Sequence, residues 1–369
     1  ETKQSWFVWA ERCRSVKRHR VIAAGTYHSA FVDSDFRLRT CGSEFQEGLL
    51  GHRILHVNRP TVVPSLSGVR IQSVAACDVF TLAVCQSGCV YAWGYGSEGQ
   101  LGQGDVASRS VPTLIEDLQE ERVAAVAVGD DHALAVTEQG AVYTWGYGID
   151  GRLGHGDGES RLLPELVGAL RQLRVVDVAA GRWHSLALCE SGGVYSWGNG
   201  GFGRLGHGEE ENLLLPTRIG ALQGVRVTGI AAGTHHTLAL SHAGELYTCG
   251  YGGNGRLGHG DTANRSAPRL VESMREVRVT AIAAGYHSSL AVTELGTLFT
   301  WGDGIGGQLG HGDEQGRLLP TRVEALKQVR VVAATAGAEH GMAITPDGRV
   351  IGWGNVNDND ARLGLGPSA

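Results

Sequence analysis

A period of 52 residues runs through this chain and limits the folds that it can adopt. The dipeptide Trp-Gly recurs at that interval, with cysteine in two slots, at Trp93, Trp145, Trp197, Trp301, Trp353, Cys41 and Cys249. A proline keeps the same interval, at Pro60, Pro112, Pro164, Pro216, Pro268 and Pro320. So does a glycine, with Cys77 in the remaining slot, at Gly25, Gly129, Gly181, Gly233, Gly285 and Gly337. Three positions with one period indicate seven copies of one structural unit.

One unit, residues 225–276, shows the expected secondary structure. Residues 225–249 contain three short apolar or alternating runs, and a G-x-x-H turn separates the first two. A glycine-rich turn at 250–260 precedes a fourth segment at 268–271, which its proline confines to a sheet edge. One such antiparallel sheet cannot bury both faces, whereas seven arranged around an axis can. The period therefore predicts an all-β fold, a seven-bladed β-propeller of four-stranded antiparallel blades.

Composition agrees with a turn-dense β protein. The chain has 56 glycines in 369 residues, about twice the usual share near 7%. Small pairs such as Ala231-Ala232 suit the innermost strand, where seven sheets crowd around the axis. Each repeated tryptophan lies far out on the third strand, where its ~150–250 Å² of surface can fill the widening gap between blades.

The repeat is out of phase with the chain ends, which predicts how the ring closes. The seventh copy stops soon after residues 363–366, without its proline and its next inner strand. A spare strand near residues 16–24 opens the chain, and we expect it to complete the last blade and leave no open edge. The expected organisation is an N-terminal extension at 1–14 and a single propeller domain at 15–369.

Charge and cysteine content bear on compartment and partner. Seven cysteines without a C-x-x-C pair favour reduced thiols in the cytoplasm or nucleus. The absence of an apolar run near 18 residues and of a signal peptide predicts a soluble protein without membrane contact. The net charge is -6, which is unlike a nucleic-acid-binding body. A weak nucleic-acid or nuclear-import contact is left to the basic residues of the N-terminal run, Arg12, Arg14, Lys17, Arg18 and Arg20.

Several motifs that would suggest chemistry keep the period and are explained by the repeat. G-x-G-x-x-G recurs at residues 94–99, 146–151 and 250–255, but L-G-H-G or L-G-Q-G follows in place of a dinucleotide-binding helix. The histidines fall mainly in two registers that would lie around a ring, so we expect structural hydrogen bonds and no metal site. We expect the turn arginines and acids to pair across adjacent blades. No cofactor and no catalytic constellation is predicted.

The informative positions are the two residues between glycine and histidine in each G-x-x-H loop, because the repeat does not dictate them. These loops would lie on one rim of the propeller. The large, polar and aromatic residues there are Tyr27, Asp131, Arg182, Trp183, His235, Tyr286 and His287. Such a composition is typical of a protein-binding surface, although ordinary solvated loop variation would also explain it.

The motifs at residues 181–188, 192–198 and 203–208 read G-x-x-H-[ST]-L-A-L, G-x-[VL]-Y-[TS]-W-G and G-[RQ]-L-G-H-G. Together they resemble the regulator of chromosome condensation repeat, over essentially all of residues 15–366. The resemblance implies a seven-bladed propeller, in agreement with the count above. It leaves function open, because the family includes an exchange factor for the small GTPase Ran, a plant ultraviolet-B photoreceptor and substrate-recruiting domains of ubiquitin ligases and kinases.

The rim sequence separates these functions. Photoreception would require a cluster of tryptophans in the rim loops, and Trp183 is the one present, so we reject it. Exchange factors of this family use an aspartate and a histidine two blades apart, and Asp131 and His235 match that spacing, but no inserted wedge follows. We therefore interpret the chain as a non-catalytic protein-interaction domain, with nucleotide exchange as the alternative. The resemblance implies a small GTPase, a ubiquitin-pathway protein or a chromatin protein as partner.

Overall fold

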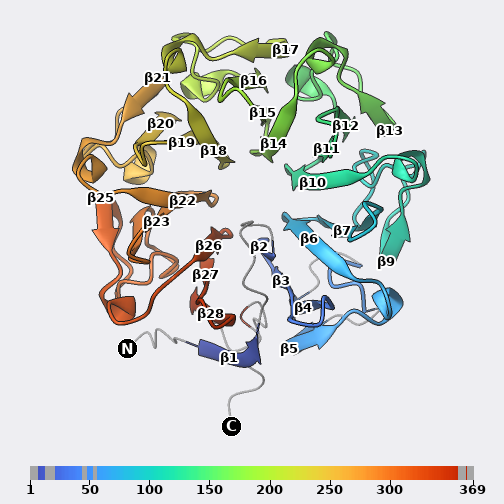
Figure 1. The fold of residues 1–369 in the computed structure, drawn as a ribbon, viewed down its shortest axis with the longest axis horizontal. Helices are drawn as coiled ribbons and strands as arrows, with labels where there is room; N and C mark the ends of the chain where they lie inside the picture. The colour runs from blue at the N-terminus through green and yellow to red at the C-terminus, as the bar shows by residue number, and fades with distance from the viewer. Residues whose placement is uncertain (1–6, 13–20, 44–47, 53–55, 356–362, 364–369) are drawn as a thin grey trace.

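Seven four-stranded antiparallel sheets surround a central axis, which confirms the predicted propeller (Figure 1). The computed structural model describes residues 7–12, 21–43, 48–52, 56–355 and 363, and for 7–12 the backbone alone. The sheets follow the chain in order, so that each blade contacts the next one in sequence.

Each blade is built from the axis outward, and strands in equivalent positions share length and burial. The innermost strands are β2 (Ile22–Ala24), β6 (Ile71–Ala76), β10 (Val123–Val128), β14 (Val175–Ala180), β18 (Val227–Ala232), β22 (Val279–Ala284) and β26 (Ala333–Ala336). The second strands are β3 (His28–Val32), β7 (Phe80–Cys85), β11 (His132–Thr137), β15 (His184–Cys189), β19 (His236–Ser241), β23 (Ser288–Thr293) and β27 (His340–Ile344). Every residue of these second strands is buried, because a neighbouring blade covers each face.

The outer half of each blade carries the tryptophans and the prolines. The third strands are β4 (Leu38–Ser43), β8 (Val90–Gly94), β12 (Val142–Gly146), β16 (Val194–Gly198), β20 (Leu246–Gly250), β24 (Leu298–Gly302) and β28 (Arg349–Gly354). The outermost strands are β5 (His56–Val62), β9 (Arg109–Leu114), β13 (Arg161–Leu166), β17 (Leu213–Arg218), β21 (Arg265–Leu270), β25 (Arg317–Arg322) and β1 (Phe7–Arg12).

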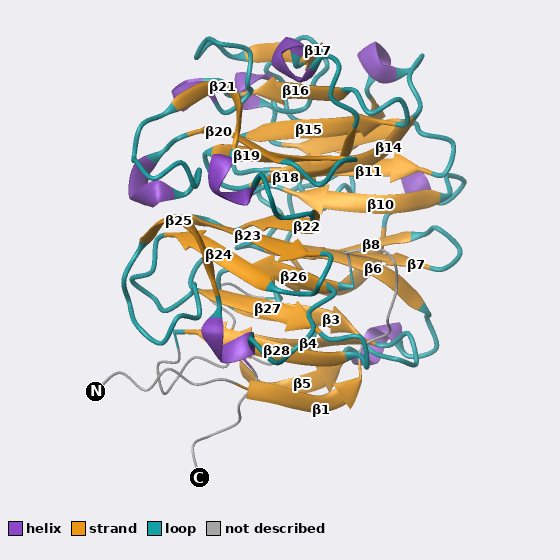
Figure 2. Ribbon diagram, turned by 60° about the vertical axis from the view of Figure 1, so that its left-hand side comes forward, coloured by secondary structure: helices purple, strands orange, loops and turns teal. Residues whose placement is uncertain are grey.

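Short 3-10 helices connect these strands at the outside of the sheets (Figure 2). Those after outermost strands are η1 (Pro64–Leu66), η2 (Glu116–Leu118), η4 (Gly168–Leu170), η6 (Gly220–Leu222), η8 (Glu272–Met274) and η9 (Glu324–Leu326). Those inside the glycine-rich turns are η3 (Ile149–Gly151), η5 (Gly201–Gly203) and η7 (Gly253–Gly255). In the described part of the chain, no helix is long and apolar enough to cross a membrane.

Small residues at the axis and large ones between blades follow from the radial geometry. Alanines of the innermost strands line an axial cavity of about 480 Å³. Farther out, Trp145 and Trp197 are fully buried between blades, as predicted. The Trp145 indole nitrogen donates to the Gln100 carbonyl and that of Trp197 to the Arg152 carbonyl, both over 2.9 Å, so each tryptophan also ties its blade to the preceding turn.

The first histidine register forms a second set of bonds between blades, as expected for structural residues. Nε2 of His184 lies 3.0 Å from the Thr237 hydroxyl of the next blade. The same contact, between His340 and Ser29 at 2.9 Å, joins the last blade to the first. Burial lowers the pKa of His28 in this register to about 4, so these rings are neutral at physiological pH and can accept or donate one hydrogen bond at each nitrogen.

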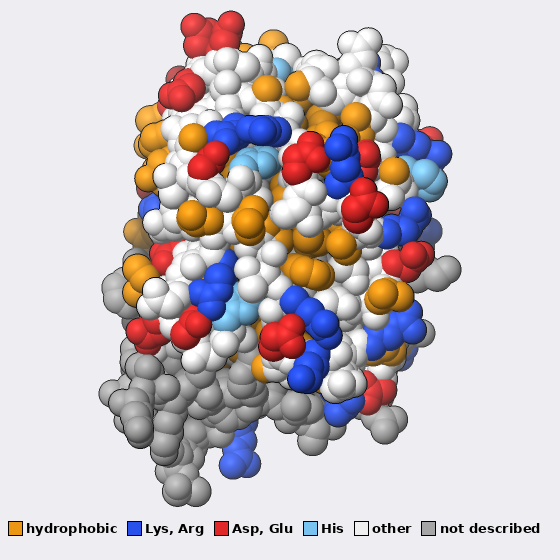
Figure 3. Space-filling model, turned by 90° about the vertical axis from the view of Figure 1, so that its left-hand side faces the viewer, with side chains coloured by type: hydrophobic (Ala, Val, Ile, Leu, Met, Phe, Trp, Pro, Cys, Tyr) orange, Lys and Arg blue, Asp and Glu red, His pale blue; other side chains and the backbone are white. Residues whose placement is uncertain are grey.

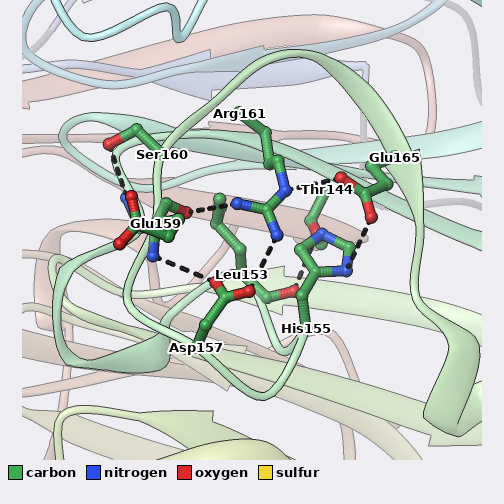
Figure 4. Close-up of polar contacts among 9 residues, drawn as sticks. Thr144, Leu153, His155, Asp157, Glu159, Ser160, Arg161 and Glu165 are labelled. Atoms are coloured by element: carbon green, nitrogen blue, oxygen red, sulfur yellow. Dashed lines mark hydrogen bonds and ion pairs between the residues drawn. The ribbon is translucent and has the colours of Figure 1, made fainter.

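The turn arginines behave differently from the prediction. Arg161 donates to Asp157 over 2.9 Å and also pairs with Glu165, all within the turn and outer strand of one blade (Figure 4). The same pairing within one turn recurs in Asp105–Arg109, Asp261–Arg265 and Asp313–Arg317. The expected pairing across blades was wrong for these arginines, because the glycine-rich turn folds back and brings residues four positions apart together.

Ring closure uses another segment than the one expected. Residues 16–20 lie outside the described residues, and Ile22–Ala24 form β2, the innermost strand of the first blade. Strand β1 (blue in Figure 1) pairs antiparallel with β28 (red) and supplies the outermost strand of the last blade. The prediction that the chain ends close the ring was right, but the segment was wrong, because β2 pairs with β3 and so belongs to the first blade.

The outer wall is polar and mixed in charge. Figure 3 shows one side of it, where basic and acidic side chains lie next to one another among scattered apolar ones. Pairs such as Arg275–Glu272 and Arg278–Glu294 are exposed on both partners. Such exposed pairs contribute little to stability, so the blades depend on the buried contacts between them.

We expect Trp197→Ala to lower the free energy of unfolding by about 3–5 kcal/mol, because it opens a cavity between two blades and leaves the Arg152 carbonyl with one fewer donor. Urea denaturation followed by circular dichroism measures this change. Leu295→Ala, in an 84% exposed hairpin position, is the matched control. Equal unfolding midpoints for the two variants would contradict the proposed role of the tryptophan.

Candidate functional site

One end of the propeller carries both kinds of variable loop. The G-x-x-H loop joins strands one and two of a blade, and the glycine-rich turn joins strands three and four. Because the strands are antiparallel, both connections lie at the same end. Tyr147 N donates to the Asp131 carbonyl over 2.8 Å and Tyr251 N to the His235 carbonyl over 2.9 Å, which holds the two loops together. We call this end the rim, formed by the two residues before each G-x-x-H histidine and the first half of each glycine-rich turn.

In blades 3 to 6 the first residue of each pair faces the axis. Asp130, Arg182, Thr234 and Tyr286 all line the mouth of the axial cavity. Nε of Arg182 lies 2.6 Å from an Asp130 carboxylate oxygen, and the Tyr286 hydroxyl approaches the other oxygen to 3.4 Å. These contacts join blades 3, 4 and 6 across the axis. We call Asp130, Arg182 and Tyr286 the mouth cluster.

The carboxyl group of the mouth cluster titrates at an unusual pH. Burial raises the pKa of Asp130 to about 7, and the nearby carboxylate of Asp78 adds to the rise, while Arg182 opposes it. Burial and the two carboxylates also raise the pKa of the Tyr286 phenol, so that it is a hydrogen-bond donor at neutral pH. Asp130 was not among the sequence-based candidates, because the period cannot say which member of the Asp130-Asp131 pair faces the axis.

The second residue of each pair faces away from the axis. Trp183 and His235 pack with their ring centroids 4.9 Å apart, and Tyr251 and Phe202 of the glycine-rich turns complete a group around His235. Phe202 and Tyr251 are 4.8 Å apart. The guanidinium of Arg182 lies 5.0 Å from the Trp183 ring centroid. We call Trp183, Phe202, His235 and Tyr251 the aromatic cluster.

Electrostatics keep His235 uncharged. Burial, followed by the positive charges of Arg204 and Arg256, lowers the pKa of His235 to about 3. The neutral imidazole therefore belongs to the aromatic cluster as a ring and carries no charge at physiological pH. Burial raises the pKa of Asp131, against the pull of Arg152. Both exchange candidates are half-buried on the rim, in separate environments two blades apart.

The structure therefore divides the seven predicted rim residues, all of which are half-buried. Arg182, Trp183 and His235 come together with the aromatic cluster, and Tyr286 and Arg182 both contact Asp130 in the mouth cluster. Nδ1 of His287 is 3.1 Å from Arg256 Nη1. Two further rim residues, Tyr27 and Asp131, belong to the first and third blades and stand apart from the aromatic cluster.

Sequence reasoning missed two members of the aromatic cluster, Phe202 and Tyr251. Both lie in glycine-rich turns that the period assigned to architecture. A signal was present at Phe202, because the equivalent turn position holds Glu98, Asp150, Asn254 and Gly306 in other blades, and an aromatic residue breaks that polar series. For Tyr251 the signal is weak, since tyrosine also occurs there as Tyr95 and Tyr147.

Other candidate sites are outside the description or lack the geometry for a ligand. The side chain of Arg12 and all of Arg14, Lys17, Arg18 and Arg20 lie outside the described residues. Among the residues that the structure does describe, no group of three or more histidine, cysteine, aspartate or glutamate side chains is placed to hold a metal ion. The second histidine register bonds within its own blade, as in His155 to Thr144 at 2.9 Å.

Comparison with known proteins identifies what this architecture is similar to. The family model described as the RCC1-like domain matches residues 8–343. Ultraviolet-B receptor UVR8 of Arabidopsis thaliana is 35% identical over 350 residues, which cover 94% of this chain and 79% of the relative. E3 ubiquitin-protein ligase HERC2 of Homo sapiens is 38% identical over 315 residues, 84% of this chain but 6% of that much longer protein.

A solved structure agrees with these relatives. Prp20p of Saccharomyces cerevisiae, described with its binding properties to Gsp1p and histones, superposes with a TM-score of 0.76 and 26% identity. The match covers 93% of this chain and 84% of Prp20p. The propeller fold is thus shared with a protein that is described with two kinds of protein partner.

The raised pKa of Asp130 predicts how pH changes stability. The folded chain holds the Asp130 proton more tightly than the unfolded chain does, so this stabilisation is complete below the unfolded pKa of 3.8 and is progressively lost as pH rises to about 7. Asp130→Asn removes the titration. Its melting temperature relative to wild type should therefore be higher at pH 8 than at pH 5, as measured by scanning calorimetry. Asp117→Asn, on the exposed turn η2, controls for the loss of one carboxylate. The same difference at both pH values would disprove titration of Asp130 in this range.

Proposed function

This chain belongs to the RCC1-like domain family, and we propose that it is a non-catalytic interaction domain whose rim binds a protein partner. The aromatic cluster carries this proposal. Trp183 is half-buried, Phe202 is 38% exposed, and Arg182 lies over the Trp183 ring. Tryptophan, tyrosine and arginine are the residue types that dominate the affinity of protein interfaces, especially when they are pre-ordered in one cluster.

Rigidity of the rim supports the same proposal. The G-x-x-H loops of the aromatic cluster lead directly into the buried strands β15 and β19, and hydrogen bonds between loop and turn hold them. A partner would therefore meet side chains that are already in place, which reduces the entropy lost on binding. The relatives named for ubiquitin ligation and for binding Gsp1p and histones are consistent with a protein partner in the ubiquitin pathway, the small GTPases or chromatin. A nuclear or cytoplasmic location fits these partners.

A second candidate function is nucleotide exchange on a small GTPase of the Ran type. The observation that favours it is the pair Asp131 and His235, both half-buried on the same rim and two blades apart. Prp20p, which is described with its binding properties to Gsp1p, adds support through the shared fold. Under this proposal the rim would act by binding and no covalent chemistry would occur on this chain.

Photoreception is not proposed, in spite of the similarity to UVR8. Of the tryptophans whose side chains are described, Trp93, Trp145, Trp197, Trp301 and Trp353 lie on third strands, buried between blades. Trp183 is the single one of this described set on the rim, and its ring packs against His235, which in turn contacts the rings of Phe202 and Tyr251. Coupled tryptophans, which the family photoreceptor requires, are therefore not assembled on this rim in the described chain.

Trp183→Ala should remove most of the partner capture, because it deletes the largest ring of the aromatic cluster. Immobilised wild type and variant can be compared by quantitative mass spectrometry of the proteins that they retain. Leu295→Ala is the control, since it removes an exposed apolar side chain at the end of blade 6 opposite to the rim. We expect a melting-temperature shift well below that of Trp197→Ala. Unchanged capture by Trp183→Ala would place the binding face elsewhere.

The exchange hypothesis predicts that the chain accelerates release of labelled GDP from Ran, and that Asp131→Asn and His235→Ala each slow that release. Stopped-flow fluorescence with mant-GDP measures the rate. Asp117→Asn, far from the rim on η2, should leave the rate unchanged. A rate equal to spontaneous release with the wild-type protein would end this hypothesis, while the protein-interaction proposal would stand.

A further inference from the structure

Arg204 is a buried cation without a counter-ion. It is 1% exposed, although it lies in the glycine-rich turn of blade 4 directly beneath the aromatic cluster. Its Nε donates to the Gly201 carbonyl over 2.8 Å, and its Nη1 is buried without a hydrogen-bond partner. Among the residues that the structure describes, no carboxylate lies within ion-pair distance of it. Burying a charge is unfavourable unless it is paired, so this arrangement calls for a compensating group.

Its surroundings supply only part of that compensation. The guanidinium carbon lies 5.3 Å from the Trp183 ring centroid and 5.6 Å from that of Phe202, so two π faces attract the charge. The charges of Asp150 and Glu210 attract Arg204 from beyond ion-pair distance, whereas that of Arg152 repels it. Asp150 is instead bound by the amides of Asn199 and Asn212 at 3.0 and 2.9 Å.

The other charged groups around Arg204 do not neutralise it. Arg182 is committed to Asp130 of the mouth cluster, and Arg256 donates to His287. The neutral ring of His235 adds no charge of either sign. This part of the rim therefore has an excess of positive charge held in a wall of low dielectric, which raises the local attraction for an anion.

Phe202 gives a second, independent indication at the same place. Its backbone is left-handed, with φ of 62°, and its side chain is 38% exposed. At the equivalent turn positions the residues are Asp150 (φ 62°) and Asn254 (φ 58°), whose short polar side chains tolerate this conformation. A bulky aromatic residue is strained there, because its side chain crowds the backbone in this conformation. Strain of this kind is usually kept where the side chain has a role in binding.

We propose that Arg204, with Trp183 and Phe202, forms a subsite for one carboxylate side chain of the partner, an aspartate or glutamate with an aromatic or aliphatic neighbour. The inference rests on the proposed function and names the chemistry that the rim recognises. Because Arg204 is 1% exposed, the carboxylate would reach its guanidinium once the 38% exposed ring of Phe202 moves aside, and the apolar neighbour would pack on that ring. A planar guanidinium beside aromatic faces suits this combination of charge and apolar contact.

A peptide fits this subsite better than a nucleic acid. The next blades along the rim carry Glu98, Asp130 and Asp131, which would repel a run of phosphates but leave room for a single carboxylate at Arg204. The net charge of the chain, -6, also opposes a polyanion. A linear acidic segment presents one charge at a time and avoids this repulsion.

The test uses variants that the repeat itself provides. Glutamine occupies the Arg204 position as Gln100 and Gln308, where its Oε1 accepts from the turn backbone at 2.9 and 2.7 Å. Arg204→Gln therefore removes the charge and keeps a side chain that this turn accommodates. Phe202→Asn places asparagine in the left-handed position that Asn254 already occupies. Arg275→Gln, on an exposed turn paired with Glu272, is the matched control for loss of one arginine.

A phage-displayed library of random dodecapeptides would be panned on the wild-type protein, and an enriched peptide labelled with fluorescein would be the probe. We expect enriched sequences to contain an aspartate or glutamate beside an apolar residue. Fluorescence anisotropy should show about 10- to 100-fold weaker binding to Arg204→Gln, from the loss of a charge-assisted pair. Phe202→Asn should weaken binding by about 3- to 10-fold, and Arg275→Gln should not change it. Substituting the acidic residue of the peptide by its amide should reproduce the Arg204→Gln loss, without adding to it in that variant.

Three results would overturn the subsite. The first is enrichment of peptides without acidic residues, and the second is equal affinity of wild type and Arg204→Gln for the labelled peptide. The third is binding of a fluorescein-labelled single-stranded oligonucleotide with the same dependence on Arg204. Loss of partner capture in Trp183→Ala together with full peptide binding by Arg204→Gln would retain the proposed function and reject this subsite. Circular dichroism of each variant confirms that the propeller is folded.

Discussion

The propeller depends on buried hydrogen bonds that each blade makes with its neighbour. In five of the seven blades, a histidine of the second strand reaches a serine or threonine hydroxyl of the following blade. A tryptophan of the third strand donates to the carbonyl of the preceding turn, 45 residues earlier. Because these groups are buried, breaking one contact leaves a polar atom without water or partner. The contacts therefore hold adjacent blades together and fix the angle between them. The rim loops join strands of these blades, so their positions are fixed as well.

The fold could be predicted from sequence because its main determinants recur. Trp145 and Trp197 lie on third strands, and His184 begins a second strand, at positions that recur with constant spacing. The period therefore predicts the number of blades and the order of strands within each blade. Two details could not be predicted in this way. The strand that closes the ring, β1, lies outside the repeat, and Arg161 pairs with Asp157 in its own turn. Both depend on where the chain folds back in space, which a linear spacing does not contain.

The rim was predicted as a set of positions, and its internal arrangement was not. Asp130 and Asp131 are adjacent in sequence, yet one faces the axis beside Arg182 and the other faces outward. Phe202 and Arg204 lie in a glycine-rich turn whose repeated pattern favours an architectural interpretation, although that turn lies next to the G-x-x-H loop of the next blade. The sequence shows which residues depart from the repeat. The structure alone shows which residues lie next to them.

The contact between His340 and Ser29 is equivalent to every other contact of its register, although it joins residues at opposite ends of the chain. Adjacency in space is thus independent of covalent order at this junction. Each blade contacts two neighbours around the ring, so the contacts themselves mark no blade as the first. The peptide links between blades join the chain but create no interface of a different kind. Evolution by duplication of a single blade could therefore proceed without redesigning the junctions, because a newly added copy meets surfaces complementary to its own on both sides.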